Sequence, residues 1–125
     1  MLTPSQTRIR ALRGATTIER DDAELLYAAT RELLTELLQR NGGTHENVVS
    51  AFFTVTPDIC TAFPAQAARE MGWHDVAMLC SLEIPVPGAL ERCIRVLLHL
   101  ELPSDQRDIR HVYLREAERL RPDRC

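Results

Sequence analysis

Lysine is absent from this 125-residue chain, and all 15 of its basic residues are arginine. Part of this bias can reflect GC-rich codon usage. The 18 acidic residues give a net charge of −3, and charges of both signs alternate without a long block of one sign. Because nucleic-acid-binding domains carry a clustered basic face, the pattern argues against a nucleic-acid partner.

Signals for export and membrane insertion are also missing. Residues Met1–Gln6 lack the apolar core and the small-residue cleavage site of a secretory signal, and no apolar run approaches membrane-spanning length. We therefore expect a cytoplasmic protein with no membrane contact. The four cysteines are Cys60, Cys80, Cys93 and Cys125. They form no C-x-x-C pair, so in a reducing compartment we expect free thiols rather than disulfides or metal ligands.

Common catalytic signatures do not occur either. The chain has no G-x-S-x-G nucleophile motif, no glycine-rich phosphate loop, no H-E-x-x-H zinc motif and no dinucleotide fingerprint. Its four histidines lack the spacing of metal ligands and are more typical of surface or internally bonded side chains. Arginine is therefore the side chain from which a functional site has to be argued.

What the chain does contain is a balanced composition, 45% hydrophobic and 26% charged, as in ordinary globular proteins. We find no internal repeat and no domain boundary, so residues 1–125 are predicted to form a single domain. A domain of this size hides roughly two-thirds of its unfolded surface, so folding requires no disulfide or structural metal.

Hydrophobic spacing predicts strands mixed with one long and one short helix. The long helix starts from an N-cap at Asp21 and stops at Asn41–Gly43, and the short helix covers Ala65–Met71 after Pro64. The predicted strands are Arg8–Gly14, Val48–Val55 as a buried central strand, Val76–Cys80 and Arg92–Leu100, with a weaker one over Asp108–Leu114. This pattern indicates an α+β or α/β domain built on a single sheet.

The most informative arginine is Arg95, because its neighbours in the strand are apolar and a guanidinium rarely sits there without an anion. That anion can be internal, from Glu83 or Glu101, or it can be a ligand. Arg13, beside Gly14, can likewise be a solvated strand end or a ligand-binding group. The residue pattern alone indicates an arginine-lined anion site and leaves these alternatives open.

Four separated motifs carry a resemblance over nearly the whole chain. They are Arg10–Thr17 (RALRGATT), Thr56-Pro57-Asp58 with Ala62-Phe63-Pro64-Ala65, Cys93-Ile94-Arg95-Val96, and Arg110–Leu114 (RHVYL) followed by Leu120-Arg121-Pro122. In content, order and approximate spacing they resemble the bacillus-type, monofunctional and trimeric chorismate mutases. Agreement of four motifs in order is far more specific than any one of them.

The resemblance implies a bacillus chorismate mutase-like mixed sheet with one long and one short helix, in a homotrimeric pseudo-α/β barrel with active sites between subunits. It implies a Claisen rearrangement of chorismate to prephenate, in phenylalanine and tyrosine biosynthesis, with no cofactor. Such a catalyst restricts a flexible dicarboxylate and stabilises charge on the ether oxygen. Arginine suits both tasks because its charge is permanent and its planar fork binds carboxylates.

Site residues follow from the resemblance position by position. Arg95 matches the arginine that contacts the ether oxygen and a carboxylate, Arg13 a carboxylate-binding arginine, and Tyr113 a neighbouring hydroxyl donor. Glu83 and Cys80 match the pair associated with the ring hydroxyl. The positions that match the substrate-binding pocket are Phe63, Ala65, Arg69, Met78 and Leu79, with Leu120 and Arg121 in a closing C-terminal segment.

This chain departs from the family pattern at Gln66, where some relatives have lysine, so a positive charge at the pocket mouth is missing unless Arg69 compensates. The N-terminus is longer than the motif needs, so residues 1–7 are expected to be disordered and 115–125 to form a mobile tail. Two alternative functions remain: an imine deaminase of the Rid type, and a catalytically silent trimer that binds a small carboxylate.

Overall fold

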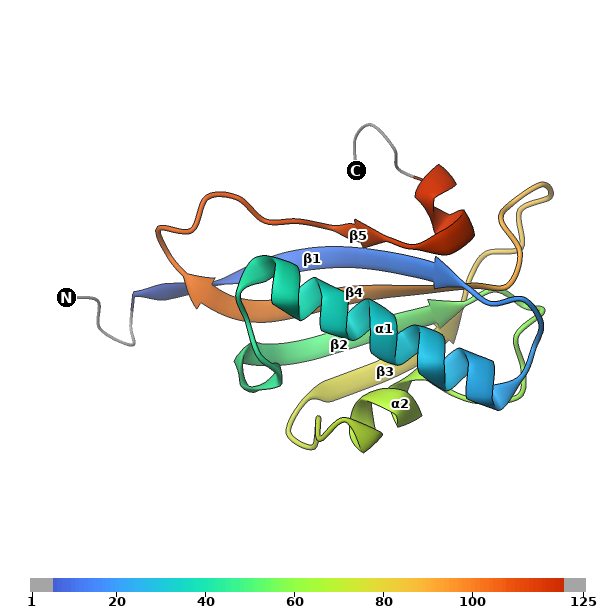
Figure 1. Cartoon of the computed structure of the whole chain (residues 1–125), viewed down its shortest axis with the longest axis horizontal. Coiled ribbons are helices and arrows are strands. Elements are labelled where there is room, and N and C mark those ends of the chain that lie inside the picture. Colours follow the sequence, from blue (N-terminus) through green and yellow to red (C-terminus); the bar gives the residue numbers. More distant parts are fainter. Residues whose placement is uncertain (1–5, 121–125) are drawn as a thin grey trace.

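The computed structural model describes residues 6–120 as a mixed sheet with two α-helices against it (Figure 1). The strand order in the sheet is β3-β2-β4-β1-β5. The strands are β1 (Thr7–Thr17), β2 (Val48–Val55), β3 (Ala77–Leu82), β4 (Cys93–Pro103) and β5 (Val112–Tyr113). The helices are α1 (Ala23–Asn41) and α2 (Pro64–Glu70), with short 3₁₀ helices η1 (His45–Asn47) and η2 (Arg115–Arg119). The predicted α+β class is confirmed.

Helix α1 begins one residue later than predicted. Its N-cap is Asp22, whose carboxylate accepts from the Leu25 backbone N–H at 3.0 Å. Asp21 instead accepts from the Cys60 backbone N–H at 3.0 Å and the Thr61 hydroxyl at 2.6 Å, so the predicted cap at Asp21 is wrong. The predicted stop is confirmed, because Gly42 closes the helix in the left-handed region at φ 72°.

Both α-helices lie on one face of the sheet (Figure 1), and the core fills the space between the helices and that face. The predicted core face of β4 is confirmed, and the fully buried side chains of this layer include Leu12, Leu33, Phe53, Leu98 and Leu100. Gly14 permits the close approach of α1. A Cβ at that position would lie 2.8 Å from the Leu37 Cδ1 atom, well inside contact distance.

The other face of the sheet is open in the single chain. Strand β2 has neighbours on both sides, as the apolar run predicts, but it is buried on one face only. Val49 and Phe52 point away from the core and are 43% and 44% exposed. The predicted full burial of this strand is therefore wrong for the chain by itself, because no helix among the described residues covers β2 on that side (Figure 1).

The ends of the sheet also differ from the prediction. Strands β1 and β4 pair antiparallel over their whole length, from Thr7 opposite Pro103 to Thr17 opposite Cys93. Thr7 thus lies in a strand and not in the disordered segment predicted over 1–7. Strand β5 is shorter than the predicted Asp108–Leu114, because the Asn41 side chain bonds both backbone groups of Arg110, at 2.7 and 2.9 Å.

The region 115–125, predicted as a mobile tail, contains the helix η2 as far as Arg119. Within the described part of the chain, no helix is long and apolar enough to cross a membrane. Cys60, Cys80 and Cys93 are free thiols. Cys125 and Arg121 lie outside the described residues.

Candidate active site

The open face of the sheet carries Arg95, Arg13 and Tyr113 close together. Ala15 of β1 and Thr54 of β2 both stand opposite Arg95, and Tyr113 of β5 stands opposite Ala15. Because paired residues point to the same side of a sheet, these side chains share one face. They line a shallow cavity of about 220 Å³. Its lining is Arg13, Gly14, Ala15, Phe52, Thr54, Arg95, Val96, Leu97 and Tyr113.

Arg95 is held by an acidic partner and still faces solvent. Its Nε lies 3.3 Å from Oε2 of Glu83, and the same oxygen accepts from the Thr54 hydroxyl. The Glu83 backbone N–H donates to the Val55 carbonyl at 2.9 Å, which fixes the start of the connector after β3. The predicted internal ion pair with Glu83 is thus present. It leaves the Arg95 side chain 44% exposed, so the guanidinium remains accessible to a second anion.

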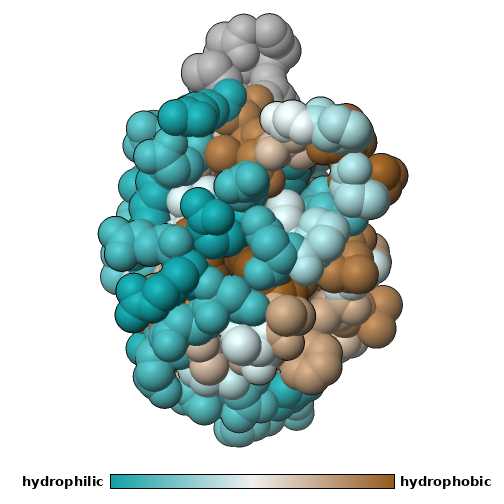
Figure 2. Space-filling model, turned by 90° about the vertical axis from the view of Figure 1, so that its right-hand side faces the viewer, coloured by the Kyte–Doolittle hydropathy of each residue, from teal (hydrophilic) through white to brown (hydrophobic). Residues whose placement is uncertain are grey.

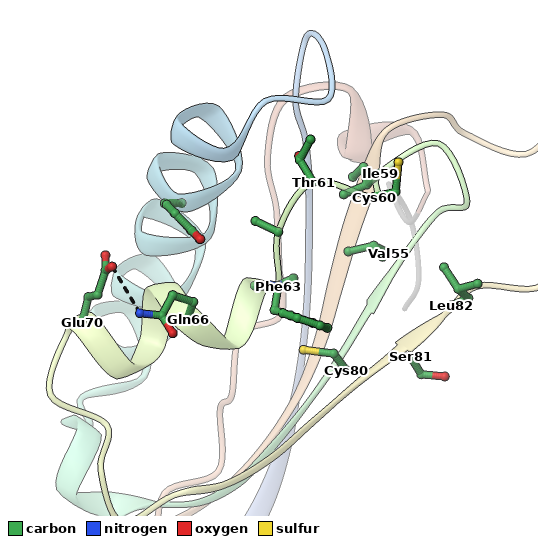
Figure 3. Close-up of a pocket in the computed structure, with 13 residues that line it drawn as sticks. Val55, Ile59, Cys60, Thr61, Phe63, Gln66, Glu70, Cys80, Ser81 and Leu82 are labelled. Carbon is green, nitrogen blue, oxygen red and sulfur yellow. Dashed lines mark hydrogen bonds between the residues drawn. The ribbon is translucent and has the colours of Figure 1, made fainter.

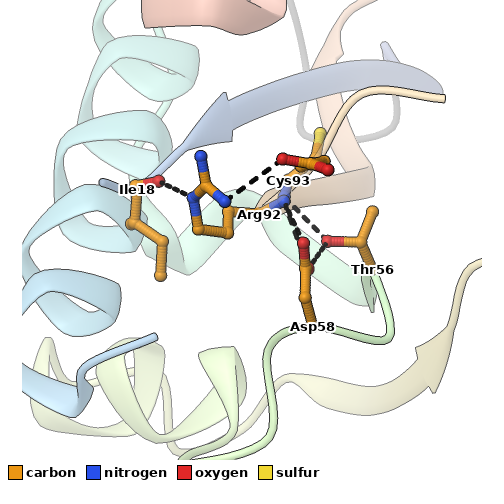
Figure 4. Close-up of polar contacts among 6 residues, drawn as sticks. Ile18, Thr56, Asp58, Arg92 and Cys93 are labelled. Carbon is orange, nitrogen blue, oxygen red and sulfur yellow. Dashed lines mark hydrogen bonds and ion pairs between the residues drawn. The ribbon is translucent and has the colours of Figure 1, made fainter. Parts of the chain in front are cut away.

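A clamp of hydrogen bonds fixes Arg92 and Cys93, where β4 begins two residues before Arg95 (Figure 4). Both oxygens of Asp58 accept from the Arg92 backbone N–H, at 3.0 and 3.2 Å, and the Thr56 hydroxyl also bonds this carboxylate. Cys93 N–H donates to the Thr56 hydroxyl at 2.9 Å. Arg92 adopts φ 47°, which is unfavourable for a side chain with a Cβ. The Thr56-Pro57-Asp58 motif therefore anchors the strand that carries Arg95.

Cys80 and Phe63 belong to a different cavity, of about 610 Å³ (Figure 3). Cys80 stands opposite Phe53 in the β2–β3 register and packs against the core, so it points to the helix-covered side of the sheet, away from Arg95. Phe63, at the N-terminus of α2, is 68% exposed. Other lining residues include Tyr27, Val55, Ile59, Gln66, Glu70 and Leu82.

The remaining predicted pocket residues are spread further. Arg69 and Met78 line a third cavity, of about 210 Å³, and Arg69 Nη1 donates to the Gln66 side-chain oxygen at 3.0 Å. Ala65 is buried in α2, whereas Leu79 points out of the sheet and is 67% exposed. Leu120 packs against a small cluster of Ala15, Cys93 and Ala117. Of the predicted polar residues that the structure describes, one chain thus brings together Arg13, Glu83, Arg95 and Tyr113.

Two polar residues of this region escape sequence reasoning. Thr54 reaches Glu83 because it alternates with buried residues on β2, a signal visible only once the strand faces are known. His111 accepts from the Arg13 backbone N–H through Nδ1 at 2.9 Å. Burial lowers the pKa of His111 below its usual 6.5, and the nearby Arg13 charge lowers it further.

Burial has the opposite effect on a thiol near the same site. Cys93 is fully buried beneath η2, and this raises its pKa from the usual 9.0 to about 11, against a smaller lowering by Arg95. The thiol is therefore protonated at neutral pH, which makes it an inert packing group here.

Arginines and a tyrosine on an open sheet face, with a held carboxylate beside them, define an α+β domain suited to binding a small anion. The chain belongs to the chorismate mutase type I family, whose model matches residues 9–124. The protein is accordingly an isomerase of the chorismate mutase class. The alternative interpretation as an imine deaminase is wrong.

Individual relatives agree with the family. The chain is 51% identical to chorismate mutase AroH of Thermus thermophilus over 116 residues, which cover 92% of this chain and 95% of that one. It is 43% identical to chorismate mutase AroH of Bacillus subtilis strain 168, covering 92% and 91%. A solved chorismate mutase from Clostridium thermocellum superposes with a TM-score of 0.81 at 46% identity, covering 87% of this chain and 97% of that one.

Proposed function

We propose that this chain converts chorismate to prephenate at a site centred on Arg95 and completed by a second copy of the chain. The observation that carries the proposal is the exposed Arg95 guanidinium, oriented by Glu83 beside Arg13 and Tyr113. In the Claisen rearrangement one C–O bond breaks while one C–C bond forms. No proton is transferred, and the reaction itself calls for no nucleophile, metal or cofactor.

Each side chain on the open face has a role that its chemistry supports. Arg95 donates to the ether oxygen, where negative charge grows in the transition state, and to a carboxylate. Arg13 binds a carboxylate of the same substrate, with the Tyr113 hydroxyl as a further donor. Glu83 holds the Arg95 guanidinium through Nε, so the remaining guanidinium N–H groups can face the substrate.

The rest of the predicted site argues for an assembly. Cys80 lies on the helix-covered side of the sheet and Arg95 on the open side, so one chain cannot bring both to one substrate. A neighbouring copy can supply Cys80, Phe63, Arg69 and Met78 to the Arg95 face, whereas Leu79 already lies on the open side of its own chain. We propose a homotrimer with three such sites, in which Leu120 and Arg121 close over the substrate.

Exposed apolar side chains support burial of this face in an assembly. On the open face, Phe52 of β2 and Leu79 of β3 are 44% and 67% exposed. Ile84 and Val86 of the connector after β3 are 80% and 58% exposed, and Leu82, on the helix-covered side with Val55, is 63% exposed. Figure 2 shows apolar side chains gathered along one side of the end that it views, with polar side chains covering the other. A contiguous patch of this kind typically marks an interface.

A direct assay tests the proposal. Purified protein is mixed with chorismate, and the loss of its ultraviolet absorbance is followed together with the appearance of prephenate. Enzyme-dependent conversion supports the proposed function. Binding of chorismate without turnover would instead support the silent carboxylate-binding trimer.

A further inference from the structure

The first hydrogen bond that a backbone group of β1 makes to the segment leading into β5 is accepted by a side chain and not by a backbone carbonyl. These parallel strands pair only at Gly14 with Val112 and Ala15 with Tyr113, and the Leu114 N–H then donates to the Ala15 carbonyl at 2.9 Å. One position earlier, the Arg13 N–H donates to His111 Nδ1 at 2.9 Å, where a continued strand would offer a carbonyl. His111 therefore takes the place of a backbone acceptor at the residue that carries a site arginine.

The surroundings show why β5 cannot supply that carbonyl. The backbone N–H and carbonyl of Arg110 are both bonded to the Asn41 side chain of α1. This draws the chain before His111 toward α1 and away from β1. A side chain that reaches back from residue 111 can then occupy the position next to Arg13.

We propose that His111 is a positioning residue for Arg13, holding the β1 backbone so that the Arg13 side chain projects into the substrate cavity at a fixed angle. This rests on the proposed function, in which Arg13 binds a substrate carboxylate. His111 acts through its hydrogen bond to the backbone and has no contact with substrate.

The bond requires a neutral ring. Because Nδ1 accepts, the ring proton sits on Nε2, and protonation at Nδ1 would turn the acceptor into a donor facing the Arg13 N–H. The charged group that acts on the His111 ring is Arg13 of β1. Helix α1 contributes the neutral Asn41 amide, which bonds Arg110, the residue before His111. Burial and the Arg13 charge both favour the neutral ring, so the bond persists at neutral pH.

Two substitutions separate positioning from a merely structural contribution. His111→Ala removes the acceptor. His111→Asn keeps one, since Oδ1 of asparagine is as many bonds from the backbone as Nδ1 of histidine, and it does not titrate. Arg13→Gln reports the role of Arg13 itself, and His45→Ala, an exposed histidine of η1, serves as the matched control.

The experiment measures KM and kcat for chorismate from pH 5 to 8, with thermal unfolding of each variant. We expect His111→Ala to raise KM about two- to tenfold at pH 7.5, with kcat within about twofold, because one net hydrogen bond is lost. His111→Asn should restore KM. Burial and the Arg13 charge lower the pKa of His111 from its usual 6.5, so wild-type KM should rise only on the acid side of that pH. This rise should be absent in His111→Asn.

Three results would overturn the inference: an unchanged KM in His111→Ala, equal KM defects in the Ala and Asn variants, or an acid rise in KM that persists in His111→Asn. If His111→Ala does not fold, the pH profile of His111→Asn decides. The proposed function is tested separately in the same series. A normal KM in Arg13→Gln would mean that Arg13 does not bind the substrate carboxylate. A raised KM in Arg13→Gln together with a normal KM in His111→Ala would reject only the positioning role of His111.

Discussion

Arg95 acquires its orientation from neighbours on other elements. Thr54 on β2 and Glu83 in the connector hold one side of the guanidinium, and Ala15 on β1 leaves space above the strand. An ion pair that is this exposed adds little to stability. Its value is geometric, because it leaves a permanent charge aimed in one direction.

Replacing Arg95 by lysine tests that geometry. Lysine keeps one positive charge but loses the planar fork, so it cannot contact Glu83, a carboxylate and the ether oxygen together. Loss of one preorganised donor to a developing oxyanion costs roughly 2.7–4 kcal/mol, so kcat should fall on the order of a hundredfold to a thousandfold.

The matched control is Arg40→Lys, since Arg40 forms an exposed ion pair with Glu36 on α1, outside the site cavity. Its kcat should stay at the wild-type value. Near-normal turnover in a folded Arg95→Lys variant would make Arg95 a structural residue and would move the catalytic role to another arginine.

Cys93 gives a prediction about alkaline pH. Its pKa is about 11 in the folded protein and near the usual 9.0 when unfolded, so the folded state favours the thiol over the thiolate. This contribution to stability is complete below pH 9 and is lost as the pH rises toward 11. Denaturant unfolding between pH 8 and 10.5 should therefore show a steeper loss of stability in the wild type than in Cys93→Ala. Parallel pH curves for the two proteins would contradict it.

At the scale of elements, the Asp58 clamp joins the end of β2 to the start of β4. Asp58→Ala leaves the Arg92 N–H without its acceptor and leaves Arg92 strained at φ 47°. We expect a loss of about 1.5–3 kcal/mol in the free energy of unfolding, the usual contribution of hydrogen bonds to charged groups. Turnover should fall as well, because β4 carries Arg95.

A second substitution shows whether strain is involved. Adding Arg92→Gly to Asp58→Ala removes the steric penalty of a positive φ and should recover about 1 kcal/mol, as urea unfolding would show. If the double variant is no more stable than Asp58→Ala, the relief of strain at Arg92 does not exceed the loss of its Nε hydrogen bond to the Ile18 carbonyl.

Sequence patterns predict the elements better than their ends. The apolar run of β2 defines Val48–Val55 to the residue, and the αL glycine after Asn41 defines the end of α1. The N-cap is predicted one residue early because Asp21 and Asp22 are chemically equivalent until the fold presents Cys60 and Thr61 to Asp21. The late start of the last predicted strand depends on Asn41, which is 69 residues away from Arg110 along the chain.

The candidate site could likewise be predicted only in part from the sequence. The residue pattern singles out Arg95, with Glu83 or Glu101 as a candidate internal partner and Arg13 as a candidate ligand-binding group. The resemblance adds Tyr113 and the roles of these side chains toward the substrate. The contributions of Thr54 and His111 depend on strand register, which no local pattern reveals. Sequence reasoning therefore finds the charged groups of the site, including Glu83, and misses the uncharged groups that help to orient them.

At the scale of the whole molecule, one face of the sheet carries the main core, and the other has only a small buried cluster under η2. Strands β2 and β3 expose Phe52 and Leu79 on the open side, next to the arginine cavity. Burying this face requires a second copy in the proposed assembly. Sedimentation at micromolar concentration should show a trimer, and a stable, active monomer would contradict the intersubunit site.

Because the two faces of the sheet contribute to different halves of a site, two inactive variants should regain activity when they assemble in one trimer. Arg95→Ala disables the open face, and Phe63→Asp sets a carboxylate against a dicarboxylate substrate at an exposed position of the other surface. Each variant alone should be nearly inactive. In a trimer co-refolded from equal amounts, about a quarter of the sites pair an intact Arg95 with an intact Phe63, so about a quarter of wild-type activity should return. A mixture that stays inactive would mean that every site is contained within one chain.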